Sequence, residues 1–188
     1  MGMEADMRTR LCLYVMICVF LLSGCDFPRE NTPSFIDVVS FAKENREDFI
    51  DCSHFLLKNF ATEDDAINIT MNENGTMRLY SYHLESAKEE RIPEVEPLLA
   101  GSMVDVITLR SNAVEYSVGG SGIGSNMTYN KIIYVPSDDI TDLFGYTEGF
   151  VFRPDKATGG VQGEKPGSDD TFFYYKIQDC LYYVITHF

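Results

Sequence analysis

The side chains that could do chemistry in this chain are few and lie far apart. The three histidines are His54, His83 and His187. A metal or nucleophile site requires such side chains to converge with carboxylates, and nothing in their spacing ties these three together. His54 lies beside an apolar helical stripe, so a position at the edge of the core is the favoured interpretation. No CxxC or HExxH motif occurs, and the sequence predicts no catalytic residue, no metal site and no cofactor.

Carboxylates gather in three predicted turns, at Glu63-Asp64-Asp65, Asp138-Asp139 and Asp169-Asp170. None of these clusters has the alternating spacing of a calcium loop, so helix and turn initiation is the preferred interpretation. The Asp138-Asp139 pair is the basis of an alternative function, a cell-envelope hydrolase that uses two carboxylates. That hypothesis requires the pair to converge with a His or Tyr in a cleft.

Two glycine-rich stretches interrupt the second half of the chain. The run from Gly119 to Gly124 lacks the Gly-Lys-Ser/Thr ending of a phosphate loop, so it is predicted to be a flexible loop. Its Ser121 and Ser125 lack a Gly-x-Ser-x-Gly elbow. The stretch from Thr158 to Gly167 is predicted to be a mobile surface loop.

The most specific signal lies at the N-terminus. Arg8 and Arg10 precede an apolar run from Leu11 to Leu22, which matches a signal peptide and is too short to span a bilayer. The run ends in Leu22-Ser23-Gly24-Cys25, which resembles the lipobox of bacterial lipoproteins. The resemblance implies that the Cys25 thiol receives a diacylglyceryl group and that a signal peptidase cuts directly before it.

The lipobox divides the chain into three parts. Residues 1–24 are the predicted lipoprotein signal peptide, residues 25–33 a short polar tether, and residues 34–188 a single domain. Two acyl chains anchor a protein stably, whereas one binds only marginally. We therefore expect a lipid-anchored protein on the extracytoplasmic face of the cell membrane, with the membrane as a partner through the lipid on Cys25.

The charge balance narrows the choice of further partners. The formal net charge is -14, and the predicted signal peptide holds equal numbers of acidic and basic residues, so the mature part keeps that charge. Such acidity argues against a nucleic-acid partner and against adhesion to anionic headgroups. The leading hypothesis is a non-enzymatic binding or interaction module for an unknown protein or envelope ligand.

Two of the five cysteines remain after the signal peptide and the lipidated residue are set aside. These are Cys52 and Cys180, and a location outside the cell permits a disulfide between them. Two buried free thiols that act as small hydrophobic side chains are the other interpretation.

The apolar pattern predicts an α+β fold, with an N-terminal amphipathic helix packed on an antiparallel sheet. An apolar stripe over Ser34–Phe60 indicates one long helix or two abutting ones, and Ser34 with Asp37 forms a capping-box-like pair. Alternation predicts hairpins with turns at Asn74-Gly75 and Ser111-Asn112.

The remaining predicted elements lead to a C-terminal hairpin over 171–187. A short helix is predicted at 94–100, a strand over Lys131–Val135 and a short strand near Phe150–Arg153. In the final hairpin, a two-residue turn at Gln178-Asp179 would pair Ile177 with Cys180.

The C-terminal part resembles a group of small uncharacterised bacterial lipoproteins. The matching features are the run Tyr116–Gly124, the strand Tyr129–Tyr134, the turn Pro136-Ser137-Asp138-Asp139 and the aromatic ending Tyr182-Tyr183 to His187-Phe188. That group has a Ser-Pro-Asp-Asp-like turn and a Trp/Tyr-rich final strand. Here the order is Pro-Ser-Asp-Asp and tryptophan is missing, and the resemblance implies no activity.

Overall fold

Ten strands and three helices make up the described part of the chain. The computed structural model describes residues 33–61, 65–81, 87–101, 103–123, 126–140 and 149–187. The helices are Phe35–Glu44 (α2), Arg46–Asn59 (α3) and Glu96–Ala100 (α4). The strands are Ile67–Met71 (β1), Met77–Tyr80 (β2), Lys88–Glu90 (β3), Val106–Leu109 (β4), Val114–Ile123 (β5), Asn126–Tyr134 (β6), Val151–Pro154 (β7), Val161–Glu164 (β8), Thr171–Gln178 (β9) and Leu181–His187 (β10).

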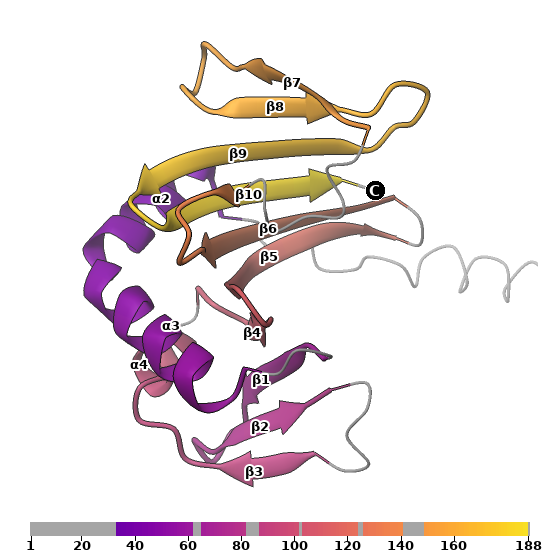
Figure 1. Ribbon diagram of the computed structural model, residues 1–188. Coiled ribbons are helices and arrows are strands. Elements are labelled where there is room, and N and C mark those ends of the chain that lie inside the picture. Colours follow the sequence, from indigo (N-terminus) through magenta and orange to yellow (C-terminus); the bar gives the residue numbers. More distant parts are fainter. Residues whose placement is uncertain are drawn as a thin grey trace, which may run out of the picture. The chain divides into compact units, whose positions relative to one another are not determined.

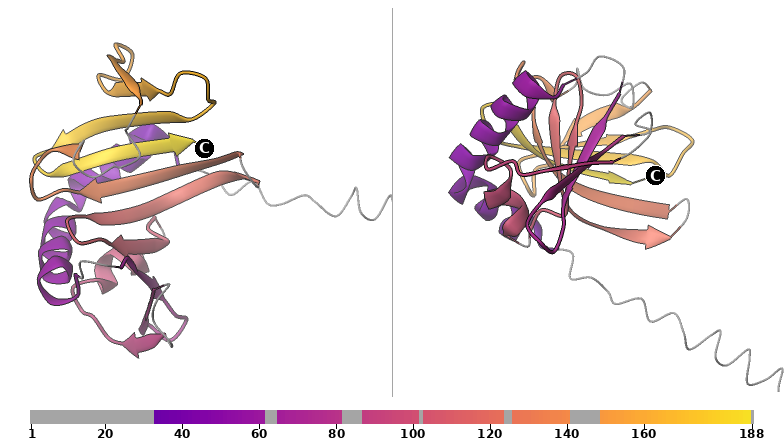
Figure 2. Two further views of the ribbon diagram at one scale, coloured as in Figure 1. Left: turned by 45° about the vertical axis from the view of Figure 1, so that its right-hand side comes forward. Right: turned by 90° about the horizontal axis from the view of Figure 1, so that it is seen from below.

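All ten strands belong to one antiparallel sheet. Their order is β3-β2-β1-β4-β5-β6-β10-β9-β8-β7, so β3 and β7 are the two edges (Figure 1). The three helices lie against the same face of this sheet (Figure 2). The chain leaves β6 in the middle of the sheet and returns as β7 at its edge, and Ile140 and Phe150 of this connection pack on the opposite face.

The predicted α+β class is wrong, because the sheet of ten strands dominates the fold and the helices are short segments. The error has a local cause, since both glycine-rich stretches that were expected to be loops contain strands. Gly119 to Ile123 continue β5 and pair with β6, and the stretch 158–167 contains β8.

In β8 and the turn before it, glycines make room for aromatic rings. A Cβ on Gly163 would lie 2.7 Å from Cε1 of Phe152, and one on Gly160 would lie 2.6 Å from Cζ of Phe173. Because rings cover the backbone at these two positions, glycine here indicates close packing in a sheet and not mobility.

The β5 glycines have a different role. Gly119 has φ +116° and lies where the pairing of β5 with β6 shifts between Ser117 and Gly120. The run therefore encodes a β-bulge in a long strand, which a loop prediction from composition misses.

The N-terminal stripe forms two abutting helices, the second of the two alternatives left open by its pattern. Ser34 Oγ accepts a hydrogen bond from the Asp37 amide at 3.3 Å, and the Ser34 amide donates to Asp37 Oδ2 at 3.2 Å, which confirms the capping box. The break falls at Asn45, whose Nδ2 donates to the Phe41 carbonyl at 2.8 Å. This side chain competes for a helical acceptor, as asparagine does near helix ends.

The helices and the sheet enclose the larger of two apolar cores. Phe49, Cys52 and Leu56 of α3 are fully buried, and the Phe49 ring meets the Tyr116 ring edge to face at 4.8 Å. The Tyr116 hydroxyl lies 2.7 Å from Ser53 Oγ and donates to the Phe49 carbonyl at 3.2 Å. A buried phenol requires such partners, so this network fixes how α3 sits on β5.

The smaller core lies on the opposite face of the sheet, over β6, β10 and β9. Its buried members are Ala113, Ile133, Val135, Ile140, Phe172, Tyr182 and Val184, with Phe150, Phe152 and Tyr174 packed against them. Rings at 6.0 to 6.5 Å connect Phe152 through Phe172 and Tyr174 to Tyr182. This row attaches the edge strand β7 to the centre of the sheet.

Local turn signals placed two hairpins correctly. β1 pairs with β2 and β4 pairs with β5, which confirms the hairpins expected around Asn74-Gly75 and Ser111-Asn112. Gly75 has φ +78° and donates its amide to the Asn72 carbonyl at 3.0 Å, as the turn requires.

The register predicted for the C-terminal hairpin is wrong. Gln178 pairs with Leu181 and Lys176 with Tyr182, so the turn residues are Asp179 and Cys180 and a bulge follows. Cys180 has φ +62°, and its amide donates to Asp138 Oδ1 at 2.7 Å. A tertiary contact from 42 residues away therefore sets the turn, and no local pattern could reveal it.

Glu115 is a buried carboxylate on the face away from the helices. It is 2% exposed and lies between the guanidinium of Arg110 and the ammonium of Lys131. Burial alone would raise the pKa of Glu115, but Lys131 and Arg110 outweigh it and hold that pKa below its usual value of 4.5. The ionised form is therefore favoured by the fold.

Replacing Glu115 should reveal this stabilisation. Because its folded pKa is lowered, the ion pair stabilises the fold above pH of about 4.5 and is lost as the pH falls through the folded pKa. Glu115→Gln should reduce the free energy of unfolding at pH 7 by about 2 kcal/mol and should flatten its decline in acid. Urea unfolding from pH 3 to 7 measures both effects. Glu89→Gln on the exposed edge strand β3 is the control, and an equal loss from both variants would contradict this account.

Candidate functional site

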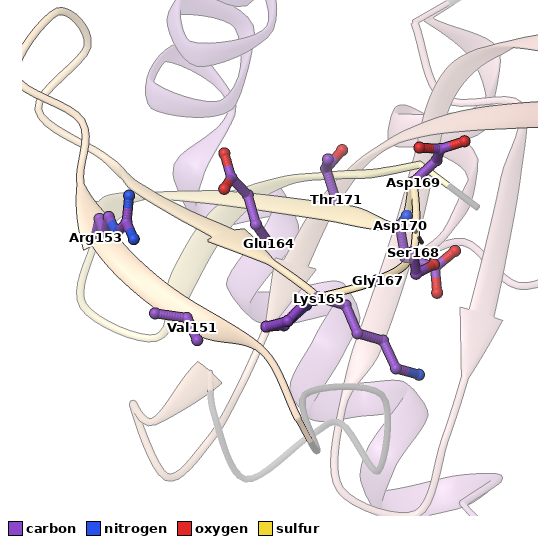
Figure 3. Close-up of a pocket in the computed structure, with 10 residues that line it drawn as sticks. Val151, Arg153, Glu164, Lys165, Gly167, Ser168, Asp169, Asp170 and Thr171 are labelled. Carbon is purple, nitrogen blue, oxygen red and sulfur yellow. Dashed lines mark hydrogen bonds between the residues drawn. The ribbon is translucent and has the colours of Figure 1, made fainter.

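A pocket lies at the β7 edge of the sheet, between β7, β8, the 165–170 loop and the start of β9 (Figure 3). Its volume is about 470 Å³, within the range of sites that hold small ligands. The lining residues are Val151, Arg153, Glu164, Lys165, Pro166, Gly167, Ser168, Asp169, Asp170 and Thr171. Five of the ten carry a charge.

The pocket loop is held in shape by its own backbone. The Lys165 amide donates to the Asp170 carbonyl at 3.3 Å, and the Ser168 amide donates to the Lys165 carbonyl at 3.1 Å. Gly167 has φ +82°, a conformation that glycine adopts at little cost. The loop thus presents Asp169 and Asp170 on a defined turn next to Thr171.

The charged side chains of the pocket are uncompensated within the described part of the chain. Arg153, Glu164, Lys165, Asp169 and Asp170 form no ion pair there. In Figure 3, Arg153 and Glu164 lie toward one end of the pocket and Asp169 toward the other. A ligand with polar or charged groups would find partners that the protein itself does not satisfy.

The edge strand β7 also has a free backbone side. The Asp155 amide donates to the Gly160 carbonyl at 2.8 Å, so this pair closes the β7–β8 turn. In an antiparallel ladder, residue pairs that are hydrogen-bonded to each other alternate with pairs that are not. Counting from the hydrogen-bonded pair Asp155–Gly160, the pairs Arg153–Gln162 and Val151–Glu164 are also hydrogen-bonded. Arg153 and Val151 therefore direct their backbone groups toward β8, whereas Phe152 and Pro154 direct theirs outward.

The structure brings one of the predicted carboxylate clusters into this pocket. Asp169 and Asp170 line it, but Asp138 and Asp139 do not. Sequence reasoning missed Arg153, Glu164 and Lys165. The sequence Val161-Gln162-Gly163-Glu164 does contain a signal for the strand that positions Glu164. Its alternation fits a strand if glycine is allowed at position 163.

Asp138 belongs to a separate group that joins the end of β6 to the β9–β10 turn. Its carboxylate accepts hydrogen bonds from Lys176 Nζ at 2.6 Å, from the Cys180 amide at 2.7 Å and from the Tyr182 hydroxyl at 2.9 Å. Asp138 has φ +55°. We call these four residues the Asp138 clasp.

The protonation states of the Asp138 clasp suit a structural role. The hydrogen bond from Lys176 and that from the Cys180 amide hold the pKa of Asp138 below its usual range. Burial, and then Asp138, raise the pKa of both Tyr182 and Cys180. The carboxylate stays ionised while the phenol and the thiol stay neutral, which does not favour Asp138 as the general acid of a hydrolase.

The histidines remain apart in the described part of the chain. His54 Nε2 lies 2.7 Å from the Tyr134 hydroxyl, an edge position like that expected from the sequence. His187 Nδ1 lies 2.9 Å from Thr128 Oγ1, and His83 lies outside the described residues. Among the residues with described placement, no group of three or more His, Cys, Asp or Glu side chains could hold a metal ion.

The two cysteines of the domain are free thiols in this structure. Cys52 is fully buried, and burial raises its pKa to about 12. Cys180 is half-buried in the turn of the final hairpin, and burial also raises its pKa. Neither thiol is activated as a nucleophile by these surroundings.

The predicted signal peptide, the lipobox with Cys25 and the tether up to residue 32 lie outside the described residues. None of the described helices is long and apolar enough to cross a membrane.

Comparisons with protein-family models, with curated proteins and with solved structures gave no match.

The environments of the two thiols predict very different reactivities. At pH 8, an aromatic disulfide reagent should modify Cys180 slowly and Cys52 only on unfolding, because a thiol must be exposed and ionised to react. The measurement uses the chain without its signal peptide and with Cys25→Ala. In the Cys180→Ser control, the folded protein should not react.

The same titration after unfolding without reductant should count two thiols. A count of zero would show a Cys52–Cys180 disulfide and would contradict the structure.

Proposed function

We propose that this protein is a lipid-anchored, non-enzymatic interaction module on the extracytoplasmic face of the cell membrane. It binds an unknown protein or envelope ligand at the pocket beside β7. The observation that supports binding most strongly is the set of uncompensated charged side chains around this pocket. The sequence Leu22-Ser23-Gly24-Cys25 supports the anchor.

The pocket is the best-supported site for three reasons. It combines side chains of both signs with an open strand edge, so it offers ionic partners and backbone partners in one place. Its shape is defined by the hydrogen bonds of the 165–170 loop. The groups with more potential for acid–base chemistry hold the Asp138 clasp together, away from this pocket.

The tether limits where the module acts. A fully extended chain advances by at most about 3.5 Å per residue, so residues 25–33 keep the domain within roughly 30 Å of the lipid. The partner is therefore expected at or near the membrane surface.

Anchoring and binding can be tested together in bacterial cells that express the chain. The wild-type protein should partition into the detergent phase, and Cys25→Ala should remain in the aqueous phase because two acyl chains are lost. A photoreactive residue at Ser168, an exposed and uncharged residue of the pocket, should form a discrete cross-linked product. One at Arg91, which directly follows β3 at the opposite edge, should not.

The detergent partition and the cross-linking each have an outcome that contradicts the proposal. Normal detergent partition of Cys25→Ala would refute the anchor. Equal cross-linking from positions 168 and 91 would refute the assignment of the binding site to the pocket.

A further inference from the structure

The two edges of the sheet differ in how they are protected. At β3, all three residues are charged and Lys88 pairs with Glu90 at 2.7 Å, a pattern that discourages another strand from adding. At β7, only Arg153 is charged and Val151 is 48% exposed. The β7 edge is therefore the one open to pairing.

The backbone of β7 offers a short ladder on its outer side. Phe152 presents an N–H and a C=O outward, and Pro154 presents only a C=O because proline has no N–H. Proline is tolerated at this position because its nitrogen faces away from β8. An added strand would form its central pair of hydrogen bonds with Phe152.

The side chains of β7 define which strand would fit. Val151 and Arg153 project on the pocket face, whereas Phe152 packs on Phe172 on the other face at 6.2 Å. Cross-strand neighbours share a face, so the added strand would place one side chain beside Arg153 and another beside Val151. Arg153 has no ionic partner in the described chain, and the exposed Val151 favours an aliphatic neighbour.

We propose that the β7 edge binds an extended segment of a partner protein as an eleventh, antiparallel strand. From its N-terminus, the segment carries an acidic residue beside Arg153, then any residue opposite Phe152, then an aliphatic residue beside Val151. This inference rests on the proposed function and names the partner of that site. The antiparallel direction follows the rest of the sheet, in which every pair is antiparallel.

A second copy of this chain fits the edge less well. Antiparallel pairing of two β7 strands about Phe152 would place Arg153 beside Val151 of the other copy and leave both guanidinium groups without a carboxylate. It would also bring together two chains that each carry a formal charge of -14.

The test uses the full chain, purified in detergent, and short synthetic peptides. The probe is acetyl-Thr-Glu-Thr-Val-Thr-amide. One control has Lys in place of Glu, and another has an N-methyl group on the central Thr, which removes a ladder hydrogen bond. Binding is followed by the amide NMR shifts of β7 as each peptide is added.

The Glu peptide should bind about fivefold more tightly than the Lys peptide, as expected for one cross-strand charge pair. Arg153→Glu should reverse this preference, whereas the matched variant Arg91→Glu should leave it unchanged. Val151→Lys, which copies the protection seen at β3, should abolish binding without affecting the fold because the side chain is exposed.

Three results would overturn the proposal: no shifts in β7 at millimolar peptide, equal binding of the N-methyl peptide, or protection of the Phe152 amide that rises with protein concentration alone. The last would identify a second copy as the occupant. If the peptides fail while cross-linking from position 168 persists in cells, only the strand-addition proposal is refuted. If anchoring fails while the peptides bind, only the membrane assignment is refuted.

Discussion

The backbone of a strand carries hydrogen-bonding groups on both of its sides, and in a row of ten strands the two outermost strands have a strand partner on one side only. The two edge strands, β3 and β7, differ in how their outer sides are protected from pairing with another strand. The β3 edge is a three-residue strand in which every side chain is charged. The β7 edge has Pro154, which removes one outward donor but leaves both backbone groups of Phe152 open. An exposed backbone edge that is not blocked can pair with another strand, so β7 is the edge better suited to binding.

Aromatic rings and glycines attach the β7 edge to the rest of the sheet. Phe152 packs on Phe172 at 6.2 Å, and it does so only because Gly163 has no Cβ to occupy the same space. Tyr174 continues the row to Tyr182, whose hydroxyl donates to Asp138. The packing that holds the edge strand thus reaches the Asp138 clasp, which fixes the end of the central hairpin. No described helix contributes to the core on this face, so aromatic packing holds the edge strand there.

The sequence was sufficient where a structure is encoded by neighbouring residues. The Ser34–Asp37 capping box and the turn at Asn74-Gly75 depend on side chains a few positions apart, and both were predicted. The sequence was insufficient where contacts between residues far apart in the chain determine the local structure. Composition alone predicts a loop at Gly163, because the ring that covers it, Phe152, is a partner only in the folded sheet. Of the pocket residues, the sequence points only to Asp169 and Asp170 as a carboxylate cluster. Arg153 joins them only through the pairing of β7 with β8, which the local sequence does not reveal.

The central claim is that the outer side of β7 is open in the free protein. The most direct measurement is the hydrogen exchange of its individual backbone amides. The ladder alternation predicts rapid exchange at Phe152, whose N–H faces outward, and slower exchange at Val151 and Arg153, whose N–H groups face β8. Fast exchange at Phe152 between two slower neighbours would support an edge available to a partner. Strong protection of the Phe152 amide in the isolated, monomeric protein would show that the edge is already paired and would contradict the account.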